Sequence, residues 1–117
     1  MVTEIVRYRI PLDRAEAFAA AYTEAGRFLA DSPHCLGYEL LRGTDEPENW
    51  VLLIRWASVG AHLEGFRLAP GFGEFLRLVM PFFAAIQEMK HYGPTSVLWA
   101  PANPLGQGGP VDQGAVD

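Results

Sequence analysis

The chain has 117 residues, half of them hydrophobic, and a formal net charge of -5. This length suits one domain with a single core, and the acidic balance leaves no basic stripe for phosphates, so nucleic acid is not an expected partner. The N-terminus MVTEIVRYRI lacks the apolar run of a signal peptide, and no segment reaches membrane-spanning length, which indicates a cytoplasmic protein. A single cysteine, Cys35, excludes an intrachain disulfide and a thiolate metal site.

Alternating apolar and polar residues over positions 2–10 predict a first strand, which Pro11 ends because proline has no N–H. Apolar positions between 15 and 29 then recur at helical spacing and predict an amphipathic helix. Asp13 is placed to cap this helix, with Glu16 three positions later completing a capping box. The helix is therefore expected to lie on the sheet that the first strand begins.

Two further strands are predicted at Cys35–Arg42 and Trp50–Trp56, joined by the polar turn 43–49 as an antiparallel hairpin. The second of these, WVLLIRW, is apolar on both faces, which is typical of a central strand covered on both sides. Ser58 is placed to cap the helix that follows, and His62 falls on the first turn of that helix, near the end of the strand and close to Trp56.

The helix after Ser58 is expected to reach about Arg67 and to break at Pro70-Gly71, before a second helical stretch over 72–83. Ile86–Tyr92 alternates again and predicts a last strand. The end of the chain is rich in proline and glycine and poor in large apolar residues, so it cannot form a core of its own. We expect one domain over residues 1–95 and a tail over 96–117.

The element order predicts an α+β, ferredoxin-like βαββαβ fold, with a four-stranded antiparallel sheet that carries its helices on one face. The other face is then bare, and Ile5, Val51, Leu53 and Met89 would place apolar side chains there. An exposed patch of that kind predicts a homodimer in which two sheets pack face to face. The alternative is that the C-terminal tail covers this face within one chain.

Four segments, IVRYRI, CLGYELLR, VLLIRWASVGAHL and the closing strand with HYG, resemble the antibiotic biosynthesis monooxygenase family. They span about residues 2–92. The resemblance implies a dimeric α+β barrel, and it is more specific for the fold than for a reaction. Members of the family include cofactor-free anthrone oxygenases, quinol oxidases, haem-degrading enzymes, an isomerase and proteins without a known substrate.

Trp56 matches the tryptophan that lines the substrate pocket of anthrone oxygenases, and His62 falls where they have a pocket tyrosine. The asparagine that they place four residues before the tryptophan is Leu52 here, so one polar group for a ring oxygen is missing. The haem-degrading relatives use a histidine on the long second helix, and the region Gly71–Phe83 has none. The resemblance therefore implies a site that works without haem or another cofactor.

A cofactor-independent oxygenase needs a base, an apolar box and donors that stabilise the substrate anion, which then passes an electron to dioxygen. We expect His62 to be the base, since an imidazole titrates near neutral pH. The expected partners are a small aromatic, anthrone-like or quinol-like substrate and dioxygen. Besides His62, the predicted pocket residues are Trp56, Tyr38, Phe66, Phe75 and Leu52 as lining, and Arg7 or Arg55 as an anion-stabilising group.

No metal is expected, because His34, His62 and His91 lie on different elements without the spacing of a helical ligand pair. Two other functions stay open at this stage. The protein would be a non-catalytic ligand-binding or interaction module if apolar side chains filled the pocket. It would be an isomerase if His62 served only in proton transfer. For Trp56, a place in the core is the alternative to a catalytic role.

Overall fold

The computed structural model describes residues 1–102, and the predicted tail lies for the most part outside these residues. The main elements follow the predicted order: β1 (Val2–Arg9), α1 (Ala15–Ala30), β2 (Cys35–Arg42), β3 (Asn49–Trp56), α2 (Phe72–Val79) and β4 (Ile86–Tyr92). Three short helical segments complete the fold: 3₁₀ turns at Leu12–Arg14 and Met80–Ala85, and a π-helix at Ala61–Phe66.

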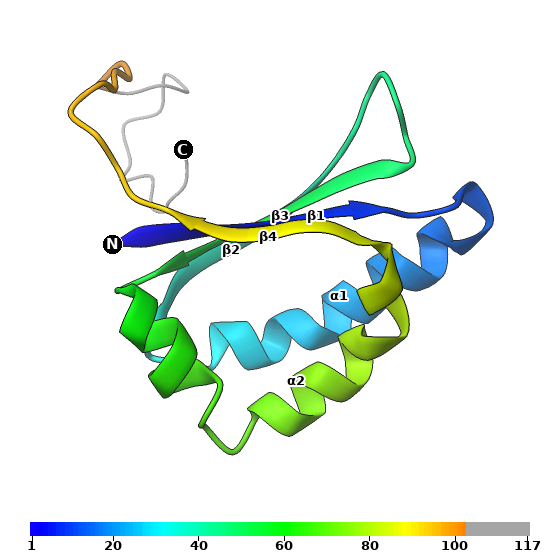
Figure 1. Cartoon of the computed structure of the whole chain (residues 1–117), viewed down its shortest axis with the longest axis horizontal. Coiled ribbons are helices and arrows are strands. Elements are labelled where there is room, and N and C mark those ends of the chain that lie inside the picture. Colours follow the sequence, from blue (N-terminus) through cyan, green and yellow to red (C-terminus); the bar gives the residue numbers. More distant parts are fainter. Residues whose placement is uncertain (103–117) are drawn as a thin grey trace.

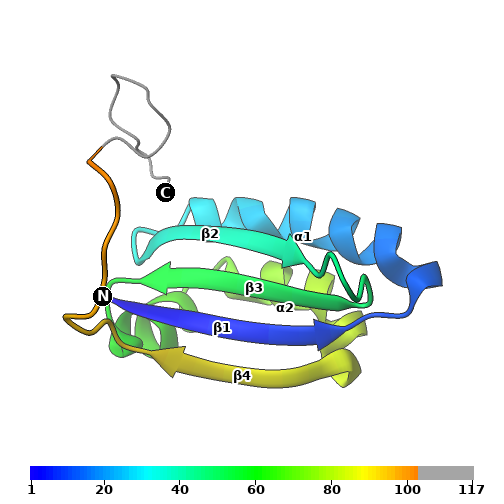
Figure 2. The same ribbon diagram turned by 90° about the horizontal axis from the view of Figure 1, so that it is seen from above.

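The four strands form one antiparallel sheet in the order β2-β3-β1-β4, with both helices on the same face (Figures 1 and 2). This arrangement confirms the predicted ferredoxin-like α+β fold and the hairpin of β2 and β3. It also places β3 inside the sheet, as its two apolar faces predict. Within residues 1–102, no helix has both the length and the apolar character that crossing a bilayer requires.

Strand alternation in β1 decides which side chains reach the helices. Glu4, Val6 and Tyr8 are buried on the helix side, whereas Arg7 and Arg9 are exposed on the other side. The same alternation in β3 buries every second residue of the strand, from Trp50 to the fully buried Trp56. A large apolar side chain that is fully buried contributes about 1.5–3 kcal/mol, so this face supplies much of the folding energy.

The two predicted helix caps have different outcomes. The Ser58 hydroxyl accepts a hydrogen bond from the Ala61 backbone N–H at 2.9 Å, which confirms the predicted cap. The capping box at Asp13 and Glu16 is wrong: α1 begins at Ala15 after a 3₁₀ turn, and no side chain caps it. The extra 3₁₀ turn satisfies backbone groups at the helix start without a side-chain acceptor.

The outward face of the sheet carries an apolar centre with charged residues around it. Ile5, Val51 and Leu53 are half-buried there, and Leu41 of β2 is 45% exposed. The prediction that Met89 belongs to this face is wrong. Met89 pairs with Val6 across the β1–β4 ladder, so both side chains point to the helix side.

Candidate active site

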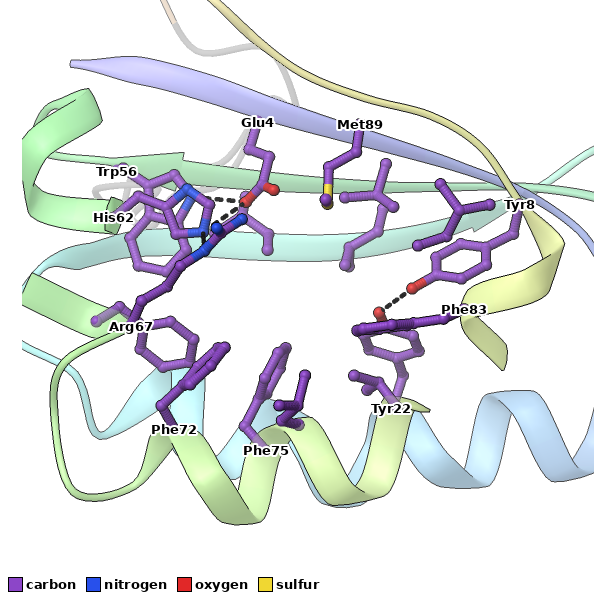
Figure 3. A pocket seen from close by; sticks show the side chains of 17 residues that line it. Glu4, Tyr8, Tyr22, Trp56, His62, Arg67, Phe72, Phe75, Phe83 and Met89 are labelled. Atoms are coloured by element: carbon purple, nitrogen blue, oxygen red, sulfur yellow. Dashed lines mark hydrogen bonds and ion pairs between the residues drawn. The ribbon is translucent and has the colours of Figure 1, made fainter. Parts of the chain in front are cut away.

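A cavity of about 230 Å³ lies between the sheet and the helices. Side chains from β1, β3, β4, the π-helix and α2 form its walls, with Tyr22 from α1 at one end (Figure 3). The walls are mostly apolar, and the apolar lining residues include Val6, Leu52, Ile54, Phe72, Phe75 and Met89. Polar side chains gather at the two ends, so the cavity suits a compact apolar molecule with polar groups at its edges.

Glu4 lies at one end of the cavity, on the helix side of β1, and is only 3% exposed. Its Oε1 accepts a hydrogen bond from the Trp56 indole N–H at 3.0 Å, and His62 Nε2 lies 3.6 Å from the same oxygen. Burial raises the pKa of Glu4 above its ordinary value, and the bond from Trp56, followed by the charges of His91 and Arg67, offsets part of this rise. Glu4 is therefore a stronger base than an exposed carboxylate.

The π-helix positions His62 and Arg67 together. The Arg67 backbone N–H donates to the His62 carbonyl at 3.1 Å, a bond across five residues that widens the turn. This wide turn brings the two side chains to one side, and Arg67 Nε donates to His62 Nε2 at 3.4 Å. Gly65 lets the turn approach the chain before β2, since a Cβ there would lie 2.6 Å from the His34 ring.

The hydrogen bonds of His62 define its protonation state. Nε2 accepts from Arg67, so Nδ1 must carry the proton that is shared with His91 Nε2 at 2.8 Å. Burial, together with the charges of Arg67 and His91, lowers the pKa of His62 to about 4. The ring also stacks on Trp56 with centroids 4.6 Å apart and planes at 10°. His62 is thus neutral near pH 7, and its contact with Glu4 is not an ion pair there.

Within residues 1–102, Glu4, His62 and His91 form a group that could hold a metal ion, because their donor atoms lie within 4.8 Å of one another. Two histidines and a carboxylate are a common ligand set for iron and zinc. Both nitrogens of His62 are already engaged, however, by His91 and by the Arg67 guanidinium. A cation at Nε2 would have to displace the bond from Arg67 and lie beside that positive charge, so the arrangement fits a proton relay better than a metal site.

At the opposite end of the cavity, the hydroxyl of Tyr8 on β1 is hydrogen-bonded to that of Tyr22 on α1 (Figure 3). Both tyrosines are at least 95% buried, with exposed fractions of 2% and 5%. Burial raises the pKa of Tyr8 to about 12 and also raises that of Tyr22. Both phenols therefore keep their protons across the physiological range of pH.

Most of the residues predicted for the site share this cavity. Trp56, His62, Phe66, Phe75 and Leu52 line it. The sequence placed His62 and Trp56 correctly near each other, because a strand end and the first turn of the next helix are neighbours in the chain. Leu52 is 1% exposed and supplies an apolar wall at the position where the resemblance to anthrone oxygenases implies an asparagine.

Arg7 and Tyr38 do not line the cavity, and their predicted pocket roles are corrected. Arg7 is an odd-numbered residue of β1, so it points to the outward face, where its Nε lies 3.4 Å from Glu88 Oε1. Arg55 shares that face. Tyr38 lies between the sheet and α1, so close to Gly26 that a Cβ on this glycine would overlap the tyrosine hydroxyl.

Sequence reasoning missed Glu4, Arg67, His91 and the two tyrosines. One signal was available for Glu4: it shares the face of Val6 and Tyr8, and a carboxylate on the buried face of a strand is unusual. His91 could not be found in this way, because its contact with His62 depends on the pairing of β4 with β1.

Comparisons with known proteins agree with this fold. An uncharacterized protein of Bacillus subtilis, YczJ, is 23% identical over 92 residues, which cover 79% of this chain and 97% of the relative. Among solved structures, a variant of SnoaB, a cofactor-independent oxygenase from Streptomyces nogalater, aligns with a TM-score of 0.68 and 23% identity. That alignment covers 83% of this chain and 95% of SnoaB.

A Bordetella bronchiseptica structure described as an antibiotic biosynthesis monooxygenase aligns with a TM-score of 0.66 at 23% identity, over 80% of this chain and 96% of the other. At these identities the structural matches establish the fold. The family model for antibiotic biosynthesis monooxygenases matches residues 1–78, about two thirds of the sequence and every element from β1 to most of α2. The chain belongs to the antibiotic biosynthesis monooxygenase family.

Proposed function

We propose that this protein is a cofactor-independent monooxygenase that oxidises a small aromatic, anthrone-like or quinol-like substrate with dioxygen. One observation carries the proposal: a buried carboxylate of raised pKa, Glu4, is held by Trp56 at one polar end of a mostly apolar cavity. Proton abstraction from an acidic C–H or O–H needs such a base in an environment that excludes water. The likeness to SnoaB supports the same reading.

The chemistry balances without a further reactant. The base takes a proton from the substrate, and the delocalised anion passes one electron to dioxygen. The substrate radical and superoxide then combine into a peroxide, which loses water. For a methylene carbon, the CH₂ group and O₂ become a carbonyl group and H₂O. The protein contributes the base, the apolar walls and a positive charge, Arg67, beside the developing anion.

Glu4 takes the role of base in this proposal, in place of the His62 that the sequence suggested. A histidine with a pKa of about 4 is a weak base at neutral pH. His62 instead connects Glu4 with His91: a proton that reaches Nε2 can leave from Nδ1 toward His91 Nε2. His91 is half-buried, so this path leads from the cavity toward solvent.

We also propose that two copies pair through their outward sheet faces. Ile5, Val51 and Leu53 form the centre of that face in each copy. Packing two such centres against each other would remove them from water, which is the dominant favourable contribution to protein association. The cavity lies on the other side of the sheet and stays complete in each copy.

The test is oxygen uptake by chelator-treated protein with a panel of anthrones and naphthoquinols. Glu4→Gln should lower kcat/KM by about 100-fold or more, because general bases contribute roughly that much. The matched control is Glu88→Gln, which removes a carboxylate from the outward face of the same sheet. Uptake that survives in Glu4→Gln, or its absence with every substrate of the panel, would overturn the proposal.

Two other outcomes of this assay are informative. Uptake that disappears with the chelator and returns with added Fe²⁺ would show that the reaction needs a metal, for which Glu4, His62 and His91 are the candidate ligands. Conversion of substrate without oxygen uptake would favour an isomerase. The observation behind that second candidate function is the presence of two proton acceptors, Glu4 Oε1 and His62 Nε2, 3.6 Å apart in one cavity.

A further inference from the structure

The hydrogen-bonded pair of Tyr8 and Tyr22 has no part in the proposed reaction, although both side chains line the cavity. They lie at the end opposite Glu4, beyond the apolar middle (Figure 3). The rings around them are apolar: Phe18 packs edge-on against both. This end of the cavity is therefore a small polar site within an apolar shell.

The hydroxyl groups of the pair offer one more hydrogen than they use. Two phenols bring two O–H groups, and a bond between them consumes one hydrogen. Their raised pKa values keep both protons in place near neutral pH. Among residues 1–102, neither hydroxyl has another protein partner. One O–H is consequently left to donate to whatever occupies the cavity, and leaving it unpaired in a buried site is unfavourable.

We propose that Tyr8 and Tyr22 form a distal binding subsite, which donates a hydrogen bond to an oxygen at the far end of an aromatic ligand whose near oxygen meets Glu4. The ligand class is then a flat, fused aromatic molecule with oxygen atoms at opposite ends. That this ligand is also a substrate rests on the proposed function. The prediction that it binds does not.

Size is consistent with such a ligand. The cavity of about 230 Å³ is larger than the roughly 150 Å³ cavity that accepts benzene in an engineered protein. It is smaller than the sites that take drug-sized ligands, which measure about 300 Å³ or more. Two fused rings therefore fit the available volume, with Phe72, Phe75 and Met89 against their faces and edges.

The experiment compares two probes, 2-naphthol and 2,6-dihydroxynaphthalene, by calorimetric titration without oxygen. The charge-assisted bond with Glu4 should hold the single hydroxyl of 2-naphthol at the near end. Wild-type protein should then bind the dihydroxy compound at least fivefold more tightly, because only this compound also reaches the tyrosines.

The variant is the double substitution Tyr8→Phe/Tyr22→Phe, since either tyrosine alone would keep a free O–H. Removing both partners of a buried hydrogen bond is nearly neutral for stability, so the double variant should fold. Circular dichroism of the variant tests this. The double variant should bind the two probes with about equal affinity, and its affinity for 2-naphthol should differ little from that of the wild type. Tyr38→Phe, outside the cavity, is the control and should keep the preference.

Equal affinity of wild type for the two probes, binding of neither probe, or a preference that the double variant retains would each overturn the subsite. The oxygenase proposal fails separately. A preference that depends on the tyrosines, in a protein that never takes up oxygen, would leave the subsite standing and remove the oxygenase. Oxygen uptake that depends on Glu4, with no effect of the tyrosines on binding, would do the reverse.

Discussion

The neighbouring side chains of Glu4 and His62 have pKa values shifted in opposite directions, and each shift favours the neutral form of its own group. Burial is the main cause for each, raising the pKa of the carboxyl and lowering that of the imidazole. Burial therefore makes the Glu4 carboxylate a stronger base and the His62 imidazole a weaker one. This environment is what turns a common carboxylate into a candidate base, and it arises only when β1, β3 and the π-helix are assembled.

His62 makes the stability of the protein sensitive to acid. Its pKa is about 4 in the folded state and ordinarily 6.5. Between these values the unfolded chain binds more protons, so the stabilisation falls as the pH falls through this window. The difference in unfolding free energy between wild type and His62→Gln should shrink from pH 7 to pH 4, as measured by urea denaturation. Leu63→Gln, which removes no titratable group, should show a constant difference; a constant difference for His62→Gln would contradict the assignment.

The pH dependence of turnover reports on Glu4. Because its pKa is raised, kcat/KM should increase with pH through a midpoint above 4.5. The charge of Arg67 lowers the pKa of Glu4, so Arg67→Gln should move this midpoint to higher pH. Arg77→Gln, which changes an exposed arginine paired with Glu74 on α2, is the control. If Arg67→Gln leaves the midpoint unchanged, the base that titrates in turnover is not Glu4.

Among the elements, the helix after Ser58 was predicted, but the sequence did not reveal that its residues Ala61–Phe66 form a π-helix. Its six residues are too few for a periodic pattern that distinguishes a turn closed across five residues from one closed across four. The strands were easier to predict: Cys35–Arg42 and Ile86–Tyr92 have the predicted bounds. Local chemistry also located the Ser58 cap, whereas the start of α1 depends on a 3₁₀ turn that the capping signal concealed.

The close approach of the π-helix to the chain before β2 can be tested at Gly65. Gly65→Ala should destabilise the protein by about 1–3 kcal/mol, the usual cost of overpacking, because the new Cβ would meet the His34 ring at 2.6 Å. In a His34→Ala background the ring is gone, so the same substitution should cost little or become favourable. Urea denaturation of the wild type, the two single variants and the double variant gives the coupling free energy between positions 34 and 65. If Gly65→Ala lowers the unfolding free energy equally in both backgrounds, the contact is not tight.

At the scale of the whole molecule, the sheet separates the side that holds the cavity from an outward side. The sequence indicated an exposed apolar face and named Ile5, Val51 and Leu53 for it, where the structure has them. It failed for β4, because the register in which that strand pairs decides which of its residues share the face. Met89 illustrates this: its own strand alternates clearly, yet only pairing with Val6 shows that it faces the cavity.

The outward face leads to a prediction about assembly. Leu53→Lys should convert the proposed dimer into a monomer, because it places a charge at the apolar centre of the contact. Light scattering after size exclusion should then give the mass of one chain, 12.9 kDa. Leu68→Lys is the control, since Leu68 is 76% exposed and lies after the π-helix, away from the sheet. A wild type that is already monomeric would contradict the dimer.

Strand alternation in β1 also has an evolutionary consequence. Val6 contributes to the cavity and Arg7 to the outward face, although they are consecutive in the chain. Selection for a new ligand can change the even-numbered positions while selection for a partner changes the odd-numbered ones, with little interference between the two. One strand can therefore change its cavity face and its outward face independently.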